Sequence, residues 1–345
     1  MSQSGLNRRT FIVSTASSAM SASLIPIPQV RAAGRDSGLA VPALPLDQEL
    51  SSIAGQAATL GLSSPRTSLV QASRSAPRLS LYLGDFLDQS LVKAKSGDAA
   101  ASDFSDRVGQ LISLITRSMR DPAEADPSLA ARRQGPPFDR LQPDYKSLFR
   151  TCNIVAANES ELDIAAKKIL SAEYQRRYRD VEFATAIKGR PGVPWYVIGS
   201  LHYREANLNF MGHLHNGDFL KAKTTDVPIG RPLGPWPPLP WDAEKAWHDS
   251  AVDALQQYSD QADWTLERML YTFEGYNGWG YRAHTRPFQH RSPYVWNYTD
   301  KGTTGGYPKD HVWSESYRSK QAGLAAILKT LKVQSPQEIP ITYYA

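Results

Sequence analysis

Apolar residues recur along much of this chain with the spacing of amphipathic helices. Val108, Leu111, Ile112 and Ile115 follow the i, i+3, i+4, i+7 pattern that places side chains on one face of a helix. Apolar patterns and capping residues predict further helices over residues 79–95, 141–152, 159–178, 195–205, 242–258, 264–273 and 315–331. The pattern as a whole is typical of a mainly α-helical protein.

One segment departs from the helical period. His213, Leu214 and His215 alternate between polar and apolar, and Asn216-Gly217 follows them directly. Asn-Gly between alternating residues is the strongest short signal for a β-hairpin, because both residues tolerate positive φ. We therefore expect a small hairpin with a return strand over 221–227, within a fold that is otherwise helical.

Composition divides the chain into five parts. Residues rich in proline, glycine and charge interrupt the helical pattern near 120–137, which marks a boundary. The expected parts are an export signal (1–32), a Ser/Pro/Gly/Ala-rich linker (33–65), a helical accessory segment (66–136), the main domain (137–332) and a C-terminal tail (333–345).

The first residues have the order of a bacterial export signal. Arg8 and Arg9 precede Thr10, Phe11 and an aliphatic pair, which resembles a twin-arginine signal. A weakly apolar run follows and ends in small residues, so we expect cleavage near Ala32. The run is too short and too polar to span a bilayer. We expect a periplasmic or extracellular protein without stable membrane insertion.

Charge and cysteine content exclude several classes of site. Lys and Arg exceed Asp and Glu by 39 − 34 = 5 among 345 residues, which is too mild for a nucleic-acid-binding footprint. Cys152 is the single cysteine, so neither an intrachain disulfide nor a cysteine-rich zinc site can form. All seven histidines lie between His202 and His311, which places candidate chemistry in the second half. We expect a monomer without a cofactor.

The helix predicted over 195–205 ends on a carboxylate. Val197, Ile198 and Leu201 share an apolar stripe, and Glu205 lies one turn beyond Leu201 on that stripe. A glutamate on a core-facing stripe is costly to ionise, so we expect its pKa to be raised. Such a carboxyl suits a general acid at neutral pH. The alternative is a helix-end glutamate bonded to backbone or to an arginine.

A second carboxylate follows the predicted hairpin turn. Asp218 lies 218 − 205 = 13 residues after Glu205, and a tight hairpin would turn it back to face Glu205 across a cleft. Inverting glycosidases hold two carboxyl groups about 6.5–9.5 Å apart, one as acid and one to activate water. The alternative for Asp218 is a turn residue that bonds its own backbone.

An aromatic segment with three glycines follows the helix predicted over 264–273. Tyr276, Trp279 and Tyr281 offer flat apolar faces for sugar rings, and Asn277 offers a hydrogen bond. The glycines indicate a tight loop in which the backbone approaches something closely. The alternative is an aromatic corner of the core.

Three short motifs in order resemble the lysozyme-like superfamily of goose-type lysozymes, lytic transglycosylases and lysozyme-like endolysins. The nearest resemblance is to bacterial lysozyme-like proteins, and it covers about residues 137–332. The motifs are His-Tyr-Arg-Glu-x-x-x-Asn-Phe at 202–210, His-Leu-His-Asn-Gly-Asp at 213–218 and Glu-Gly-Tyr-Asn-Gly-x-Gly-Tyr-Arg at 274–282, followed by Ser-Pro-Tyr-Val-Trp at 292–296.

The resemblance implies a glycoside hydrolase that cleaves peptidoglycan, or a related β-linked polysaccharide, between N-acetylmuramic acid and N-acetylglucosamine. It implies a lysozyme-like helical domain in which Glu205 is the general acid and Asp218 is the base or the residue that orients water. A lytic transglycosylase route that needs Glu205 alone is the better choice if Asp218 does not face the cleft. The implied substrate-binding residues are Tyr276, Asn277, Trp279, Tyr281, His202 and His215.

Two other functions stay open. His213 and His215 alternate on one strand face, and together with His202 and Asp218 they would suit zinc in a metal-dependent hydrolase. No HExxH motif supports this, and the spacing fixes no third ligand. A non-catalytic glycan- or cell-wall-binding protein that keeps the fold alone is the other alternative.

Overall fold

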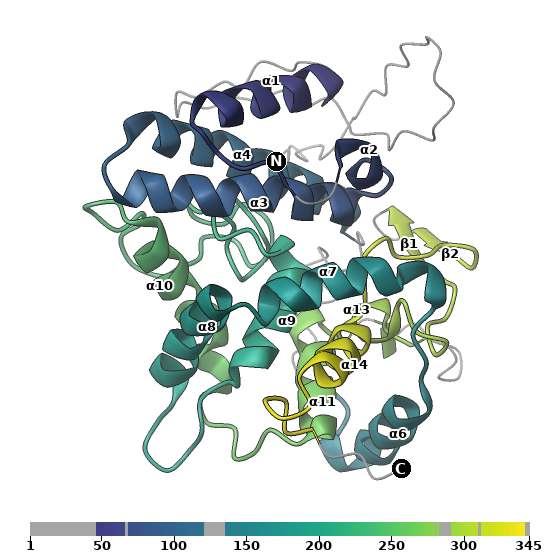
Figure 1. Cartoon of the computed structure of the whole chain (residues 1–345). Helices are drawn as coiled ribbons and strands as arrows, with labels where there is room; N and C mark the ends of the chain where they lie inside the picture. Colours follow the sequence, from purple (N-terminus) through teal and green to yellow (C-terminus); the bar gives the residue numbers. More distant parts are fainter. Residues whose placement is uncertain are drawn as a thin grey trace, which may run out of the picture.

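The computed structural model describes residues 46–65, 68–120, 135–279, 281–282, 291–309 and 312–341, and over this range the chain is mainly α-helical (Figure 1). The helices are α1 (Leu46–Thr59), α2 (Leu69–Ala72), α3 (Ala76–Lys95), α4 (Ala99–Met119), α6 (Phe138–Thr151), α7 (Glu159–Ile169), α8 (Ala172–Thr185), α9 (Trp195–Ala206), α10 (Ala243–Leu255), α11 (Leu266–Asn277), α13 (Pro293–Trp296) and α14 (Leu324–Gln334), with 3₁₀ turns η2 (Ala156–Asn158) and η3 (Gln256–Tyr258). Strands β1 (Gly306–Lys309) and β2 (Val312–Ser314) pair antiparallel.

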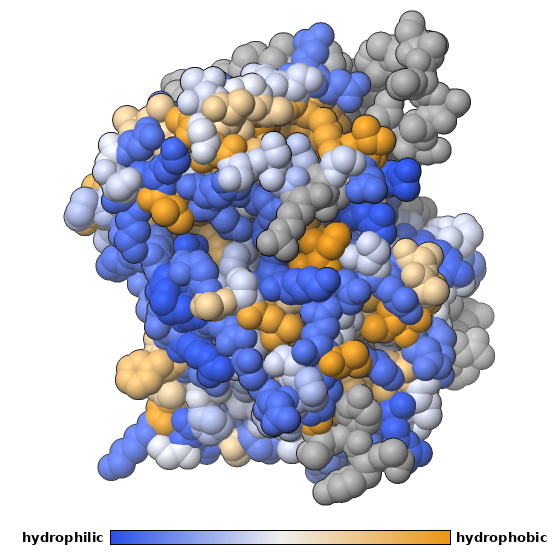
Figure 2. Space-filling view, viewed as in Figure 1, coloured by the Kyte–Doolittle hydropathy of each residue, from blue (hydrophilic) through white to orange (hydrophobic). Residues whose placement is uncertain are grey.

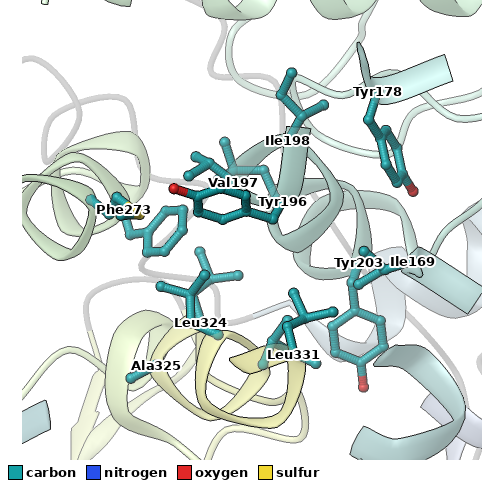
Figure 3. Close-up of a cluster of buried hydrophobic side chains, with 14 of the residues drawn as sticks. Ile169, Tyr178, Tyr196, Val197, Ile198, Tyr203, Phe273, Leu324, Ala325 and Leu331 are labelled. Atoms are coloured by element: carbon teal, nitrogen blue, oxygen red, sulfur yellow. The ribbon is translucent and has the colours of Figure 1, made fainter. Parts of the chain in front are cut away.

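Helix α9 lies at the centre of the main core. Val197, Ile198 and Leu201 have no exposed surface, which confirms the predicted stripe. Figure 3 shows side chains of α9 among residues from α7, α8, α11 and α14. Gly199 permits this close packing, because a Cβ there would lie 2.7 Å from Ile169 Cγ2. Each fully buried Val, Leu or Ile side chain contributes about 1.5–3 kcal/mol, so this environment fixes the position of α9.

The N-terminal helices have a core of their own. Helices α3 and α4 lie side by side, and α1 lies above them in the view of Figure 1 and contacts α4. Both α3 and α4 occupy predicted helical ranges, and Val108, Ile112 and Ile115 are fully buried. The linker expected over 33–65 is wrong for residues 46–59, which form α1. Leu50 and Ile53 anchor α1 in this core.

The two cores are joined by partly buried charges. Lys168 of α7 pairs with Asp85 at 2.9 Å and with Asp88 at 3.1 Å, both on α3. Tyr174 donates a hydrogen bond to the same Asp88 at 2.8 Å. Met211, from the segment that follows α9, packs into the N-terminal core. The helices of the expected accessory segment are thus packed on the main domain rather than set apart from it.

Several predicted helix bounds differ from the observed ones. The helix expected over 159–178 is two helices, because the chain turns at Leu170 and Ser171 between α7 and α8. Helix α11 runs four residues beyond its predicted end and stops at Gly278, whose φ of 94° no helix allows. The helix expected over 315–331 begins at Leu324 instead.

The expected hairpin at 213–227 is not formed. The chain does reverse at Asn216-Gly217, but a single isolated bridge joins Gly212 to Phe219, and the described residues 221–227 contain no strand. Hydrogen bonds within the turn, such as Gly217 N–H to the His213 carbonyl at 2.6 Å, hold a compact loop. The observed strand pair, β1 and β2, lies elsewhere in the sequence.

The face of the molecule shown in Figure 2 is largely hydrophilic, with scattered hydrophobic patches. Among the helices that the structure describes, none is both long enough and apolar enough to cross a membrane. The predicted export signal lies outside the described residues and stays a prediction.

Candidate functional site

Glu205 is the least buried residue of an otherwise buried helix. The other residues of α9 are all classed as buried, whereas the Glu205 side chain is 12% exposed. Tyr294 of α13 donates a hydrogen bond from its hydroxyl to Glu205 Oε1 at 2.5 Å. This hydrogen bond ties one oxygen of the carboxyl to α13.

The chain directly after Glu205 is anchored to α4. Asn207 and Leu208 have φ angles of 50° and 62°, which end α9 in a left-handed turn. Asn207 donates to Thr116 Oγ1 at 2.9 Å, and Asn209 donates to the Gly109 carbonyl at 3.0 Å. The asparagines of the first motif therefore attach the end of α9 to the N-terminal helices.

The loop over 212–219 packs against the last turn of α9. Gly217 has a φ of 66°, and a Cβ at this position would lie 2.3 Å from the Glu205 carbonyl oxygen. Both the backbone conformation and the close approach require glycine. The Asn216-Gly217 pair thus brings Asp218 into the neighbourhood of Glu205, although without the predicted strands.

Asp218 is 4% exposed, and both of its oxygens are occupied. Oδ1 accepts from Arg117 Nη2 at 2.6 Å, and Oδ2 accepts from the backbone N–H groups of Thr225 and Asp226 at 2.8 and 2.9 Å. Burial raises the pKa of Asp218, but the charges of Arg120 and Arg117 and these hydrogen bonds outweigh burial and lower it. A carboxylate bound in this way is a weak base, and its backbone partners lie seven and eight residues away rather than within its own turn.

Two arginines from the end of α4 complete the charged cluster. Arg117 also pairs with Asp226 at 3.1 Å. Arg120 lies 3.9 Å from Glu205 Oε2 and 3.8 Å from Asp226 Oδ2. The Tyr294 hydroxyl and the Arg120 guanidinium are thus two hydrogen-bond donor groups near the Glu205 carboxyl. The raised pKa expected for Glu205 stays a prediction.

Three tyrosines surround Glu205. Tyr276 donates to the Leu214 carbonyl at 2.9 Å and stacks on Tyr258 with ring centroids 6.2 Å apart. Burial, followed by the negative charge of Glu205, raises the pKa of Tyr258, Tyr276 and Tyr294. The three hydroxyls are therefore protonated at neutral pH. Tyr276, expected in a loop, lies in the last turn of α11.

The other expected sugar-binding residues have different surroundings. Asn277 is the partly buried last residue of α11. Trp279 is 8% exposed and contacts Tyr271, with ring centroids 4.7 Å apart, while Tyr281 is 2% exposed. Trp279 and Tyr281 thus match the alternative of an aromatic corner of the core.

His202 does not reach the surface, which contradicts its expected role in substrate binding. Its ring has no exposed surface and lies between Phe210 and Trp247, with centroids 4.6 and 4.9 Å away. Its Nδ1 is 2.9 Å from the Tyr178 hydroxyl. Burial lowers the pKa of His202 to about 3. The helical stripe could not reveal this, because α9 is buried on every side.

The two histidines of the second motif hold the loop over 212–219 in place through hydrogen bonds. His213 Nε2 lies 2.7 Å from the Ala222 carbonyl, and its Nδ1 lies 2.7 Å from Ser250 Oγ. The carbonyl can only accept, so Nε2 carries the proton. His215 Nε2 lies 2.8 Å from Asp253 Oδ2, and the side chain is 3% exposed. The contact of His215 with substrate stays a prediction, and its Nε2 already has Asp253 as a hydrogen-bond partner.

These contacts do not assemble the metal site considered above. Both ring nitrogens of His213 are engaged, His202 lies in the core, and Asp218 is bound to Arg117. Within the described ranges, no group of three or more His, Cys, Asp or Glu side chains is placed to hold a metal ion. Burial lowers the pKa of His213 to about 4, so its ring is neutral at pH 7.

No protein-family model, no curated protein and no solved structure matches the chain. The site is therefore interpreted from its own geometry.

Sequence reasoning missed Arg117, Arg120 and Tyr258, and it named Tyr294 only within a motif. The two arginines lie three residues apart at the end of α4, so they share a helix face. That spacing was readable, but the partners of Arg117 lie 218 − 117 = 101 and 226 − 117 = 109 residues further along the chain. Tertiary packing alone brings them together.

A cavity of about 610 Å³ lies away from this cluster, between α3, α4, α8 and the start of α10. Phe210, Met211 and Trp241 line it together with paired charges such as Lys95 and Glu244. Glu205 is not among its lining residues.

Proposed function

We propose that this protein is a lysozyme-like glycosidase that cleaves peptidoglycan, with Glu205 as its general acid. The observation that carries the proposal is the setting of Glu205. A buried helix holds the carboxyl, Tyr294 bonds one oxygen at 2.5 Å, and protonated tyrosines surround it. Glycosidases require a positioned carboxyl that can give a proton to the glycosidic oxygen.

The contacts of Asp218 favour a route with a single carboxyl group. A second carboxylate that activates water needs a free lone pair, whereas Asp218 accepts from Arg117 and from two backbone N–H groups. We therefore propose the transglycosylase-like route over inverting hydrolysis. Asp218 serves in this proposal to hold the loop against α9.

This route has two proton transfers. Glu205 gives its proton to the glycosidic oxygen, the bond from the sugar C1 to that oxygen breaks, and the electron pair stays with the leaving oxygen. The C6 hydroxyl of the same sugar then bonds to C1 and gives its proton to the Glu205 carboxylate. The carboxyl group is regenerated, and the product carries a 1,6-anhydro ring.

Product analysis tests the route. The full chain is incubated with purified peptidoglycan, and the released fragments are analysed by mass spectrometry. The proposal predicts 1,6-anhydromuramic ends, which are lighter by one water than the products of hydrolysis. Reducing ends instead would show hydrolysis and return a water-activating role to Asp218 or to another group. Binding without release would favour the non-catalytic glycan-binding protein.

Export, a monomeric state and peptidoglycan as the natural polymer belong to the same proposal. The twin-arginine pattern supports export, because a peptidoglycan-cleaving enzyme must reach the cell wall. A positive net charge of 5 supports attraction to an anionic polymer.

A further inference from the structure

Arg117 and Arg120 lie on the same face of the end of α4 but contact their carboxylates differently. Arg117 forms tight pairs, at 2.6 Å with Asp218 and 3.1 Å with Asp226. Arg120 lies 3.8 Å from Asp226 and 3.9 Å from Glu205. The tight pair favours the charged form of Asp218, whereas the wider gap beside Glu205 leaves room for a neutral carboxyl.

The guanidinium of Arg120 has an uncommitted nitrogen. Its side chain is 11% exposed, and the buried Nη2 makes no hydrogen bond. A buried charged donor without an acceptor is costly. The same Nη2 is the atom that lies 3.9 Å from Glu205 Oε2, and a charge-assisted hydrogen bond needs about 2.7–2.9 Å. A shift of about 1 Å would form this bond.

We propose that Arg120 is a positioning residue that stabilises the carboxylate which Glu205 becomes after giving up its proton. The inference rests on the proposed function. While Glu205 is protonated, the loose contact leaves it neutral. Once the proton has passed to the glycosidic oxygen, Nη2 closes on Oε2. A donor that is already positioned near the developing charge lowers the barrier, because no solvent has to be reorganised to supply it.

Among the described residues named above, the other neighbours of Glu205 do not supply a positive charge at its carboxyl. The hydroxyls of the three surrounding tyrosines stay neutral, since their pKa values are raised. Asp218 and Asp226 are negative and paired with Arg117. The Arg204 guanidinium lies over the Tyr294 ring, 4.7 Å from its centroid. Within the described ranges, the charged and titratable groups near Glu205 or in contact with its neighbours include Arg117, Arg120, Arg204, Asp218, Asp226, Tyr258, Tyr276 and Tyr294.

The test measures the protonation of Glu205 in the full chain with and without the positive charge. In wild type, Arg120→Gln and Arg120→Met, the carboxyl carbons of glutamate are labelled with ¹³C, and the Glu205 signal is assigned by its loss in Glu205→Gln. An opposite charge at this distance lowers a carboxyl pKa by about one unit or more. Both Arg120 variants should therefore raise the titration midpoint of Glu205 by about one pH unit.

The pH dependence of activity should shift together with the Glu205 midpoint. The basic limb of the pH–rate profile should move upward by about one unit, and kcat should fall about tenfold or more. Arg120→Lys keeps the charge and should keep the limb near that of wild type. Arg107→Gln is the matched control, because Arg107 lies on the same helix but pairs with Glu49 at 2.7 Å. It should change neither quantity.

The outcomes separate the two proposals. An unchanged Glu205 midpoint in a folded Arg120→Gln or Arg120→Met variant overturns the role of Arg120, whatever the activity. Arg120→Met fills the buried space without charge, so it carries the test if Arg120→Gln does not fold. If wild type releases no fragments from peptidoglycan, the proposed function fails, while the titration still decides whether Arg120 controls Glu205.

Discussion

Replacing Gly217 by alanine should separate the loop from the end of α9. The residue has a φ of 66°, and the added Cβ would lie 2.3 Å from the Glu205 carbonyl oxygen and 3.3 Å from Ala206 Cα. The left-handed conformation alone costs a non-glycine residue about 1–2 kcal/mol. The contact with backbone cannot be relieved by a side-chain rotation, and overpacking of this kind adds about 1–3 kcal/mol.

Gly189 provides the matched control. Its φ is 80°, but a Cβ there would meet nothing within 4 Å. Gly189→Ala should therefore destabilise the fold by about 1–2 kcal/mol, and Gly217→Ala by about 2–5 kcal/mol. Urea denaturation measures the free energy of unfolding of each variant against wild type.

The variants Gly217→Ala and Gly189→Ala should also differ in activity. Gly217→Ala should impair cleavage of peptidoglycan under conditions in which the variant is still folded, because the loop that carries Asp218 can no longer pack against the end of α9 beside Glu205. Gly189→Ala should retain activity. Equal losses of stability in the two variants would refute the close approach of the loop to α9.

Two further predictions concern buried titratable groups. Asp218→Asn should destabilise the fold by about 1–3 kcal/mol at pH 7, because it removes the charged acceptor of two backbone N–H groups and of Arg117, which is 42% exposed and keeps Asp226 as a partner. Because the folded-state pKa of Asp218 is lowered, this contribution is present above the unfolded pKa of about 3.9 and is lost as the pH falls through the lower folded pKa, so the stabilities of wild type and variant should converge only below that folded pKa. His202 stays neutral in the folded state down to a pKa of about 3, whereas the unfolded chain takes up a proton near pH 6.5. Stability should therefore fall as the pH drops from 6.5 toward 3, and His202→Asn should remove that component of the slope in thermal unfolding; an unaltered slope would contradict the neutral buried ring.

The helical part of the fold was predictable where apolar residues are large and regularly spaced. The spacing of Val108, Ile112 and Ile115 predicts α4 in this way. Helix α1 was missed because its buried positions, including Leu50 and Ile53, are diluted by serine, glycine and alanine, which are typical of linkers as well.

The position of Glu205 at a helix end was also predictable, since it follows from a local period. The period could not show that α9 is enclosed on every side, and so it could not distinguish a core residue such as His202 from a surface one. Nor could it place Arg120 beside Glu205, because that contact spans 205 − 120 = 85 residues and depends on how α4 packs.

The loop over 212–219 shows a different kind of error. Asn216-Gly217 correctly predicted a chain reversal, since Gly217 has positive φ. The strands on either side were wrong, because the Asp218 carboxylate accepts a hydrogen bond from the backbone N–H of Thr225 and the His213 ring donates one to the Ala222 carbonyl, which hold the chain in an irregular loop. Side-chain contacts here replace the ladder that the alternation of residues predicted.

The central claim is that the Glu205 carboxyl delivers the proton that breaks the glycosidic bond. The most direct measurement compares wild type with Glu205→Gln on purified peptidoglycan and records both polymer binding and released fragments. Glu159→Gln, at an exposed position in the first turn of α7, is the control. We predict that Glu205→Gln binds and folds like wild type but releases almost no fragments, while Glu159→Gln remains active. Undiminished release by folded Glu205→Gln would contradict the account.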